Sequence, residues 1–143
     1  MINAQPNKYF QNAVQTASPA QLLIMLYDGA IRNCKMSIEA IRKQELIDAN
    51  LYIGKVQDII SEFVITLDHN SPLAEQLTRL YEYFQYRLIE ANMKKTVEPI
   101  EEVMTHLIDL KETWLKAASS ANAGAAQSVG APAAGESKQY GSV

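Results

Sequence analysis

The fold is decided by residues 16–30, which read TASPAQLLIMLYDGA. Ser18 offers a side-chain oxygen to the first free N–H groups of a helix, and Pro19 suits the first helical position, where no N–H partner is needed. Beyond them apolar residues return at helical spacing, on a stripe that continues to Ile41. The stretch therefore predicts a helix over about residues 19–43.

Similar signals predict three more helices. Ser71-Pro72 repeats the cap and proline pattern, and Thr96, with Glu98 in the next turn, is expected to cap the last helix. The start near residues 45–47 has no clear cap. The apolar period between these signals predicts helices over about residues 46–68, 72–93 and 97–118. Four helices joined by short loops favour an all-α, antiparallel four-helix bundle.

The two ends of the chain differ from the predicted bundle, which spans residues 18–118. Residues 1–17 are expected to form an N-terminal cap segment, because Tyr9, Phe10 and their neighbours fall on one side of a short helix that is stable only when it docks. The pattern fits a displaceable cap and a permanently packed one equally well. Residues 119–143 are mainly Ala, Ser and Gly, which predicts a disordered, flexible tail.

Composition and charge disfavour several function classes. A net charge of −3 and a pI near 5.4 argue against nucleic acid as a partner and against a polybasic membrane-surface module. The longest apolar run, Leu22 to Tyr27, is far too short to insert into a membrane. Because Cys34 is the single cysteine and the N-terminus lacks the layout of a signal peptide, we expect a cytoplasmic protein.

Residues that carry catalysis or bind metals are not arranged for either task. His69 and His106 each lack the glutamate three residues earlier that di-iron bundles use, and His106 fits a partly buried helix position. Cys34 falls on the core stripe, which predicts a protonated, unreactive thiol. Gly29 and Gly54 stand alone inside helices and form no phosphate loop. We therefore expect no enzyme, no metal and no cofactor.

Several apolar residues fall outside the core stripes when the helices are projected at about 100° per residue. They are Leu22 and Met25 on the first helix, Leu51 and Ile65 on the second, and Tyr86, Ile89 and Met93 on the third. Each one alone could equally pack under a loop or widen the core. As a set they favour a surface that another molecule covers, because proteins that act alone rarely expose contiguous apolar patches.

Three separated motifs resemble those of the flagellar secretion chaperone FliS family. They are the segment TASP with QL and MLYDGA in residues 16–30, the run LYEYFQYRLIEAN at residues 80–92, and IEEV at residues 100–103 followed by Trp114. Tyr9 also stands where the family has a tyrosine upstream of TASP. The resemblance spans about residues 9–118 and does not include the tail.

The resemblance implies a function and a set of contacts. Members of the family are cytoplasmic bundles that bind the C-terminal segment of flagellin, prevent its premature polymerisation and deliver it to the cytoplasmic domain of the flagellar type III export gate. Their N-terminal segment covers part of the groove until flagellin replaces it. We expect the contact or cap residues to be Tyr9, Leu22, Met25, Ile65, Tyr86, Ile89 and Met93.

One alternative from another class stays open at the level of sequence. A structural bundle could use its extra apolar face to form a homodimer, weak or obligate, and an obligate dimer would leave no free groove. A metal or cofactor enzyme is the third reading, and it would require stoichiometric metal in the purified protein.

Overall fold

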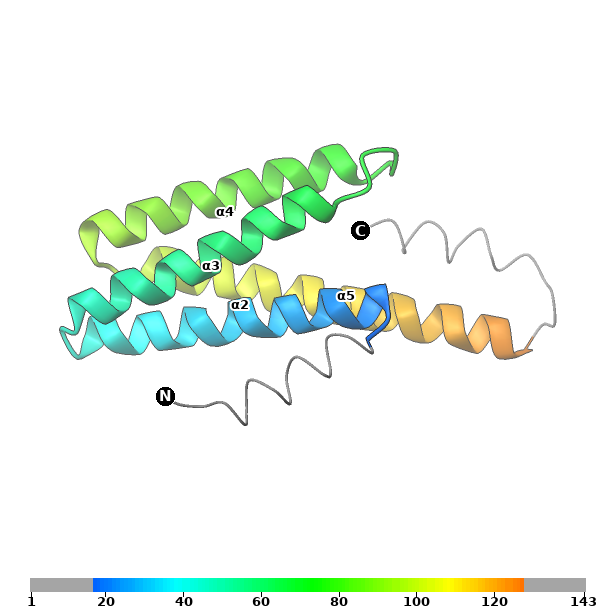
Figure 1. Cartoon of the computed structure of the whole chain (residues 1–143), viewed down its shortest axis with the longest axis horizontal. Helices are drawn as coiled ribbons and strands as arrows, with labels where there is room; N and C mark the ends of the chain where they lie inside the picture. Colours follow the sequence, from blue (N-terminus) through cyan, green and yellow to red (C-terminus); the bar gives the residue numbers. More distant parts are fainter. Residues whose placement is uncertain (1–16, 128–143) are drawn as a thin grey trace.

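The computed structural model describes residues 17–127, and it describes side-chain surroundings for residues 17–120. Within this range the chain forms the helices α2 (Pro19–Arg42), α3 (Leu46–Thr66), α4 (Ala74–Lys94) and α5 (Glu98–Gln127). Consecutive helices run antiparallel, and α5 returns to pack against α2 (Figure 1). The predicted fold class, an antiparallel four-helix bundle, is confirmed.

The start of α2 agrees with the prediction. The backbone N–H of Gln21 donates to Ser18 Oγ at 3.2 Å, and the N–H of Ser18 donates to Gln21 Oε1 at 2.8 Å. This reciprocal pair is a capping box, and Pro19 occupies the first turn. The start of α3 at Leu46 follows Glu45, whose side chain makes no cap hydrogen bond, as the absence of a sequence signal indicated.

The start of α4 was predicted two residues too early. Ser71 does not cap the helix, because its Oγ accepts a hydrogen bond from the N–H of Leu73 at 3.2 Å and its carbonyl accepts one from Ala74 at 3.1 Å. These bonds close a turn before the helix begins at Ala74. Serine before proline therefore marks a chain reversal here and not the helix cap itself.

The start of α5 is also later than predicted, because residue 96 still belongs to the end of α4. Lys95 adopts a left-handed conformation with φ 52°, and the N–H groups of Lys95 and Thr96 both donate to the carbonyl of Ala91. Thr96 therefore helps to close α4, and α5 begins at Glu98.

The end of α5 was predicted too early. The helix continues past Ala118 to Gln127, into the segment predicted as a flexible tail. Alanine has the highest helix propensity of all residues, so an alanine-rich extension of an existing helix needs little burial. The rest of the predicted tail and almost all of the predicted cap segment lie outside the described residues, and the division of the chain into cap, bundle and tail stays a prediction.

The centre of the bundle is an aromatic cluster to which each helix contributes. The rings of Tyr27 and Phe63 stack with centroids 4.5 Å apart, and Phe63 packs against Tyr81 at 5.3 Å. The hydroxyl groups of Tyr27 and Tyr81 lie 2.9 Å apart, and Trp114 Nε1 donates to the Tyr27 hydroxyl at 3.0 Å. Each polar atom of this buried cluster thus has a partner, and burial raises the pKa of both tyrosines.

Cys34 and His106 occupy the environments that the sequence predicted. Cys34 is completely buried, and burial raises the pKa of its thiol to about 12, so the thiol is protonated and unreactive. His106 is half-buried on α5, and its ring lies 5.6 Å from that of Phe84. No helix in residues 17–127 is both long enough and apolar enough to cross a membrane.

Candidate protein-binding surface

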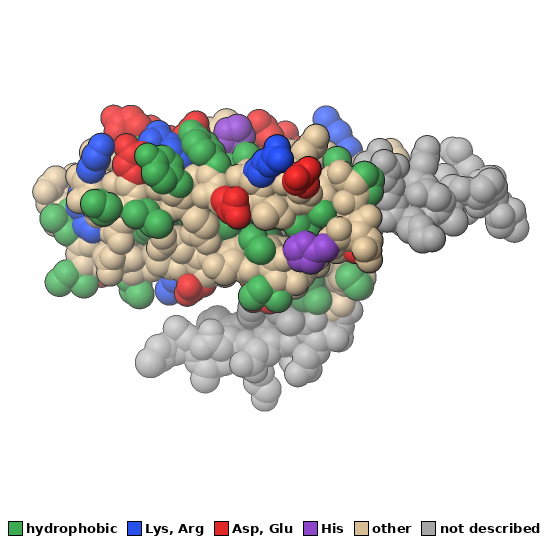
Figure 2. Space-filling view, turned by 90° about the horizontal axis from the view of Figure 1, so that it is seen from above, with side chains coloured by type: hydrophobic (Ala, Val, Ile, Leu, Met, Phe, Trp, Pro, Cys, Tyr) green, Lys and Arg blue, Asp and Glu red, His purple; other side chains and the backbone are tan. Residues whose placement is uncertain are grey.

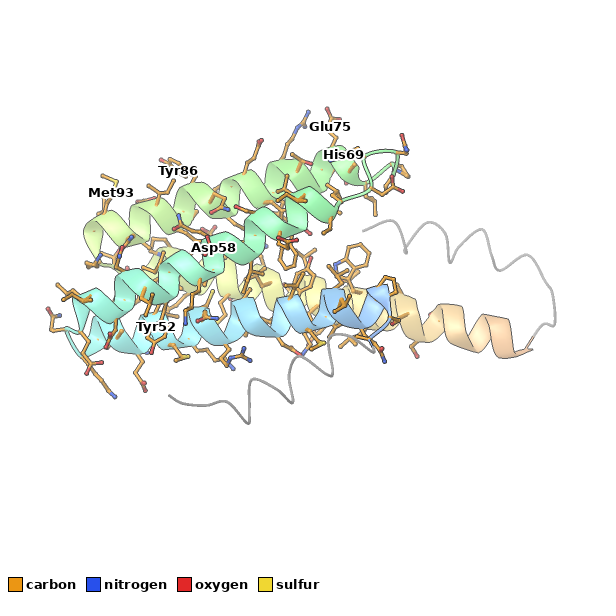
Figure 3. The ribbon with its side chains drawn as sticks, viewed as in Figure 1. Tyr52, Asp58, His69, Glu75, Tyr86 and Met93 are labelled. Atoms are coloured by element: carbon orange, nitrogen blue, oxygen red, sulfur yellow. The ribbon has the colours of Figure 1, made fainter. Side chains whose placement is uncertain are left out.

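The outer side of α4 carries three exposed apolar residues. Tyr86, Ile89 and Met93 are 65%, 50% and 80% exposed, although their neighbours Phe84 and Leu88 are completely buried. The spacing of three and four residues places the exposed set on one side of the helix. Figure 3 shows Tyr86 and Met93 pointing away from the bundle. The second apolar stripe predicted for this helix therefore lies at the surface.

The outer side of α3 continues this apolar surface. Ile47 and Ile65 are 87% and 72% exposed, and Leu51 is also exposed. All three lie on the side of α3 that is turned away from its buried residues, since they are separated by nearly whole numbers of helical turns. Two helices thus present apolar side chains outward.

Hydrogen bonds between α3 and α4 fix which residues lie at the same level. Asn92 Nδ2 donates to Asn50 Oδ1 at 2.6 Å, and Gln85 Nε2 donates to the carbonyl of Gln57 at 2.9 Å. The beginning of α3 therefore lies beside the end of α4. We call this surface the α3–α4 face, and its apolar residues are Ile47, Leu51, Ile65, Tyr86, Ile89 and Met93.

The α3–α4 face is not uniform along its length. Figure 2 looks down onto the outer side of α4 and shows several green hydrophobic side chains toward the left, with red acidic and blue basic side chains among them and again nearer the middle. The register places Ile47 and Leu51 at the same end as Ile89 and Met93, whereas Ile65 lies toward the other end of α3. The apolar residues are thus concentrated at the end where α4 finishes.

A second surface, the α2–α3 groove, lies on the other side of α3. It has a volume of about 410 Å³ and is lined by Met25, Leu26, Asp28, Gly29, Arg32, Asn33 and Ile59. A Cβ atom at Gly29 would lie 3.4 Å from Ile59 Cδ1, so α2 and α3 pack closely at the floor of the groove. α3 thus stands between two surfaces that carry apolar side chains.

The expected contact residues divide between these surfaces. Ile65, Tyr86, Ile89 and Met93 lie on the α3–α4 face, and Met25 lines the α2–α3 groove. Leu22 and Met25 are half-buried, so they are less exposed than their projection away from the core stripe suggested, and Leu22 does not line the groove. Tyr9 lies outside the described residues.

Ile47 belongs to the α3–α4 face, but the sequence interpretation missed it. The signal was present, because Ile47 lies one turn before Leu51 and five turns before Ile65 on the same helix side. Ile59, which precedes the fully buried Ile60, is half-buried and lines the groove.

The side of α4 turned toward α5 is polar instead. Arg87 Nε donates to Glu102 Oε1 at 2.6 Å, Arg87 Nη1 donates to Glu90 Oε1 at 2.6 Å, and the Tyr83 hydroxyl donates to Glu102 Oε2 at 2.8 Å. The hydrogen bonds from Arg87 and Tyr83 hold the pKa of the Glu102 carboxyl below its usual range. The polar groups on this side of α4 therefore hydrogen-bond to one another and to α5.

The accessible part of the described surface offers mainly apolar contact area. Within residues 17–120 no group of three or more His, Cys, Asp or Glu side chains is arranged to hold a metal ion. The buried Cys34 thiol is not accessible to a substrate. What the surface offers is apolar area beside helix grooves, which suits the side chains of another helix.

Several known proteins are similar to this chain in sequence. The flagellar secretion chaperone FliS of Bacillus subtilis strain 168 is 33% identical over 112 residues, which cover 78% of this chain and 84% of that protein. The flagellar secretion chaperone FliSB of Pseudomonas aeruginosa is 31% identical over 71% of this chain and 82% of its own length. The flagellar secretion chaperone FliS of Campylobacter jejuni is 31% identical over 78% of this chain and 89% of its own length.

The family described as flagellar protein FliS matches residues 1–121, which include the four helices up to the last turns of α5. The relatives are named as chaperones of flagellar secretion, and the described part of the bundle has the exposed apolar residues that such a role needs. This chain belongs to the flagellar protein FliS family.

Proposed function

We propose that this protein is a cytoplasmic, non-catalytic export chaperone whose client is the C-terminal segment of flagellin. Binding would keep that segment from polymerising before export and would deliver it to the cytoplasmic domain of the flagellar type III export gate. Membership of the FliS family supports the general role, since the relatives are named as flagellar secretion chaperones. The choice of client and of export gate comes from the family resemblance.

The observation that carries the proposal is the exposure of apolar side chains on the α3–α4 face. Fully exposing large apolar side chains such as Ile47, Ile65 and Met93 forgoes about 1.5–3 kcal/mol for each one that a partner could bury. The core below them is already closed, so these residues are not needed for internal packing. They therefore favour a surface that works when it is covered.

The mechanism follows from the shape of the two surfaces. A bound amphipathic helix contacts a groove with its side chains at positions i, i+3 or i+4 and i+7. Tyr86, Ile89 and Met93 of α4 have the same spacing, so they can pack along such a helix. A client segment that is disordered when free would fold as it binds, and ordering it opposes binding by several kcal/mol. We expect a long client segment that uses both the α3–α4 face and the α2–α3 groove. In this proposal the N-terminal segment around Tyr9 covers part of the surface until the client replaces it.

Co-purification with flagellin tests the proposal most directly. The full chain is expected to form a stable 1:1 complex with flagellin of the same organism and to lose it when the C-terminal residues of flagellin are removed. An N-terminus that becomes more sensitive to protease in the complex would support the displaceable cap. Retention of flagellin that lacks its C-terminal residues would show that the client segment is wrong.

The variant Tyr86→Asp tests the position of the client. It should weaken binding of the flagellin segment at least about tenfold, because a carboxylate replaces a buried aromatic contact. Melting and helicity should stay almost unchanged, since Tyr86 is exposed in the free protein.

The matched control for this variant is Leu115→Asp. Leu115 is an exposed apolar residue of α5 beside Ile31 and Ile108, away from the α3–α4 face. The Leu115→Asp variant should therefore keep normal client affinity. Equal losses in both variants would contradict the assignment of the face, and unfolding of Tyr86→Asp would place Tyr86 in the core.

A homodimer through the extra apolar face is the competing function. Light scattering across a range of concentrations separates the two, because an obligate dimer would remove the free face. A monomer that binds flagellin supports the chaperone, whereas a dimer that Tyr86→Asp dissociates supports the alternative.

A further inference from the structure

We propose that the α3–α4 face selects client helices whose apolar stripe is flanked by lysine or arginine. The inference rests on the proposed function and adds the chemistry of the client segment at this face. It comes from the charged residues that lie among the apolar ones.

Acidic side chains occupy the middle of the α3–α4 face. Asp58 and Glu62 are exposed and lie one turn apart on the outer side of α3, and Glu82 is exposed on α4, one turn before Tyr86. Figure 3 shows Asp58 in the middle of α3, between the levels of Tyr86 and His69. None of the three carboxylates has an ion-pair partner in the described part of the chain.

Register between the helices brings these carboxylates to a similar level along the bundle. Gln85 Nε2 donates to the carbonyl of Gln57 at 2.9 Å and lies 3.3 Å from Ser61 Oγ. On α3, Gln57 directly precedes Asp58, and Ser61 directly precedes Glu62. On α4, Gln85 lies three residues after Glu82. The three carboxylates therefore lie near one level of the face, between Ile65 and the apolar end at Met93.

Basic residues of the two helices do not neutralise this part of the face. Arg79 pairs with Glu75 at 3.2 Å, and Lys94 pairs with Glu90 at 3.3 Å. Arg87 is held by its two carboxylates on the side toward α5. Lys55, the one basic residue of α3, lies one turn before Asp58, and its Nζ lies 5.9 Å from the ring centroid of Tyr52. Three carboxylates against one lysine leave the middle of the face with a net negative charge.

The apolar end and the acidic middle of the α3–α4 face differ, so the face can distinguish the two orientations of a docked helix. A docked helix would place apolar residues against Ile89, Met93 and Leu51, and basic residues against Asp58, Glu62 and Glu82. Exposed ion pairs are individually weak, each worth up to about a fivefold change in affinity, and they are screened by salt. Together they would favour one client orientation and raise the association rate more than they tighten the complex.

Two synthetic amphipathic peptides test the inference on the full-length chain. They share one apolar stripe and carry either Lys or Glu at the positions beside it, and calorimetry measures their affinity at low and at high salt. The Lys peptide should bind about tenfold more tightly at low salt, and the difference should shrink at about 0.5 M salt. Equal affinity, tighter binding of the Glu peptide, or no binding of either peptide would overturn the inference.

A charge reversal locates the effect. Glu82→Lys should abolish the preference for the Lys peptide, whereas Glu112→Lys, an exposed glutamate of α5 outside this face, should keep it. Loss of the preference in both variants would point to net charge and would contradict a local site.

The flagellin C-terminal segment is measured with the same protein samples. If it binds while the peptides show no preference, the proposed function stands and the inference on charge fails. If the peptides show the preference while the flagellin segment does not bind, the inference stands and the proposed client is wrong.

Discussion

The interior of the bundle and its α3–α4 face contain similar residues, but these residues differ in how many packing and hydrogen-bond partners they have. Around Tyr27, Phe63 and Tyr81, each ring has stacking partners and each hydroxyl has a hydrogen-bond partner. On the face, Tyr86 and Met93 extend from the helix without cover from the described residues. Both regions are apolar and aromatic, so composition alone does not distinguish them.

The difference separates residues that stabilise the fold from residues that are available to a partner. A closed core supplies the free energy of folding, and additional apolar side chains outside it add little to that free energy while they remain in water. Substitutions in the two regions should therefore affect different measurements, stability in the first and client binding in the second.

The largest contrast in stability is expected between Phe63→Ala and Tyr86→Ala. Phe63→Ala should lower the free energy of unfolding by about 3–5 kcal/mol, because it leaves a cavity between Tyr27 and Tyr81. Tyr86→Ala should change the same quantity by less than about 0.5 kcal/mol. Urea denaturation followed by circular dichroism measures both, and similar losses would erase the distinction between interior and face.

A smaller effect is expected when only a hydroxyl is removed from the interior. Tyr27→Phe keeps the ring stack but leaves Trp114 Nε1 and the Tyr81 hydroxyl without their shared partner. The free energy of unfolding should fall by about 1–3 kcal/mol, the usual effect of unsatisfied buried polar groups. Tyr86→Phe, which removes a hydroxyl from the face, is the matched control and should be neutral. A neutral result for Tyr27→Phe would mean that water replaces the lost hydroxyl.

Alkaline pH should weaken the interior. The pKa of Cys34 is raised from an ordinary value of 9.0 to about 12, so above about pH 9 the unfolded chain releases a proton that the folded chain keeps. The free energy of unfolding therefore falls as pH rises from 9 toward 12, and it is fully retained below pH 9. At pH 10 the loss should be roughly 1 kcal/mol. Buried Tyr27 and Tyr81, whose pKa values are also raised, extend the decline above pH 10.

The variant Cys34→Ala tests the origin of this decline. Between pH 9 and 10, urea denaturation should give a flatter dependence of stability on pH for this variant than for the parent protein. An unchanged slope would mean that other groups, and not the buried thiol, control alkaline stability.

The smallest stability change is expected at the outer end of the face. Met93→Ser should alter the free energy of unfolding by less than about 0.5 kcal/mol, because Met93 is mostly exposed. It should nevertheless weaken binding of the flagellin segment by about fivefold to thirtyfold, since a buried methionine contributes about 1–2 kcal/mol at an interface. Calorimetric titration checks the second value, and unchanged affinity would restrict the client to the part of the face near Tyr86.

Local signals predicted the architecture of the bundle well. Ser18 and Pro19 determine the start of α2 through bonds within a few residues, and helical periodicity depends only on the spacing of apolar side chains. Helix ends were predicted less well because they depend on competing hydrogen bonds. Ser71 satisfies a turn, and Thr96 closes α4, although both residue types are good helix caps.

The binding surface could be predicted only in part. Periodicity identified Tyr86, Ile89 and Met93 as residues outside the core, and their exposure agrees. It could not show that α3 stands between two surfaces, because the level of one helix beside another depends on contacts such as the bond from Asn92 to Asn50. The half-burial of Leu22 and Met25 likewise depends on tertiary packing that a single-helix projection does not contain.

Trp114 is the one tryptophan of the chain, and its indole is anchored in the cluster where the four helices meet. Its fluorescence emission should therefore report whether the whole bundle is assembled, and it should be insensitive to a guest that settles on the outer sides of α3 and α4. Tryptophan fluorescence can thus report whether a variant is folded. A variant that loses client affinity but keeps the emission of the parent protein has lost binding and not structure.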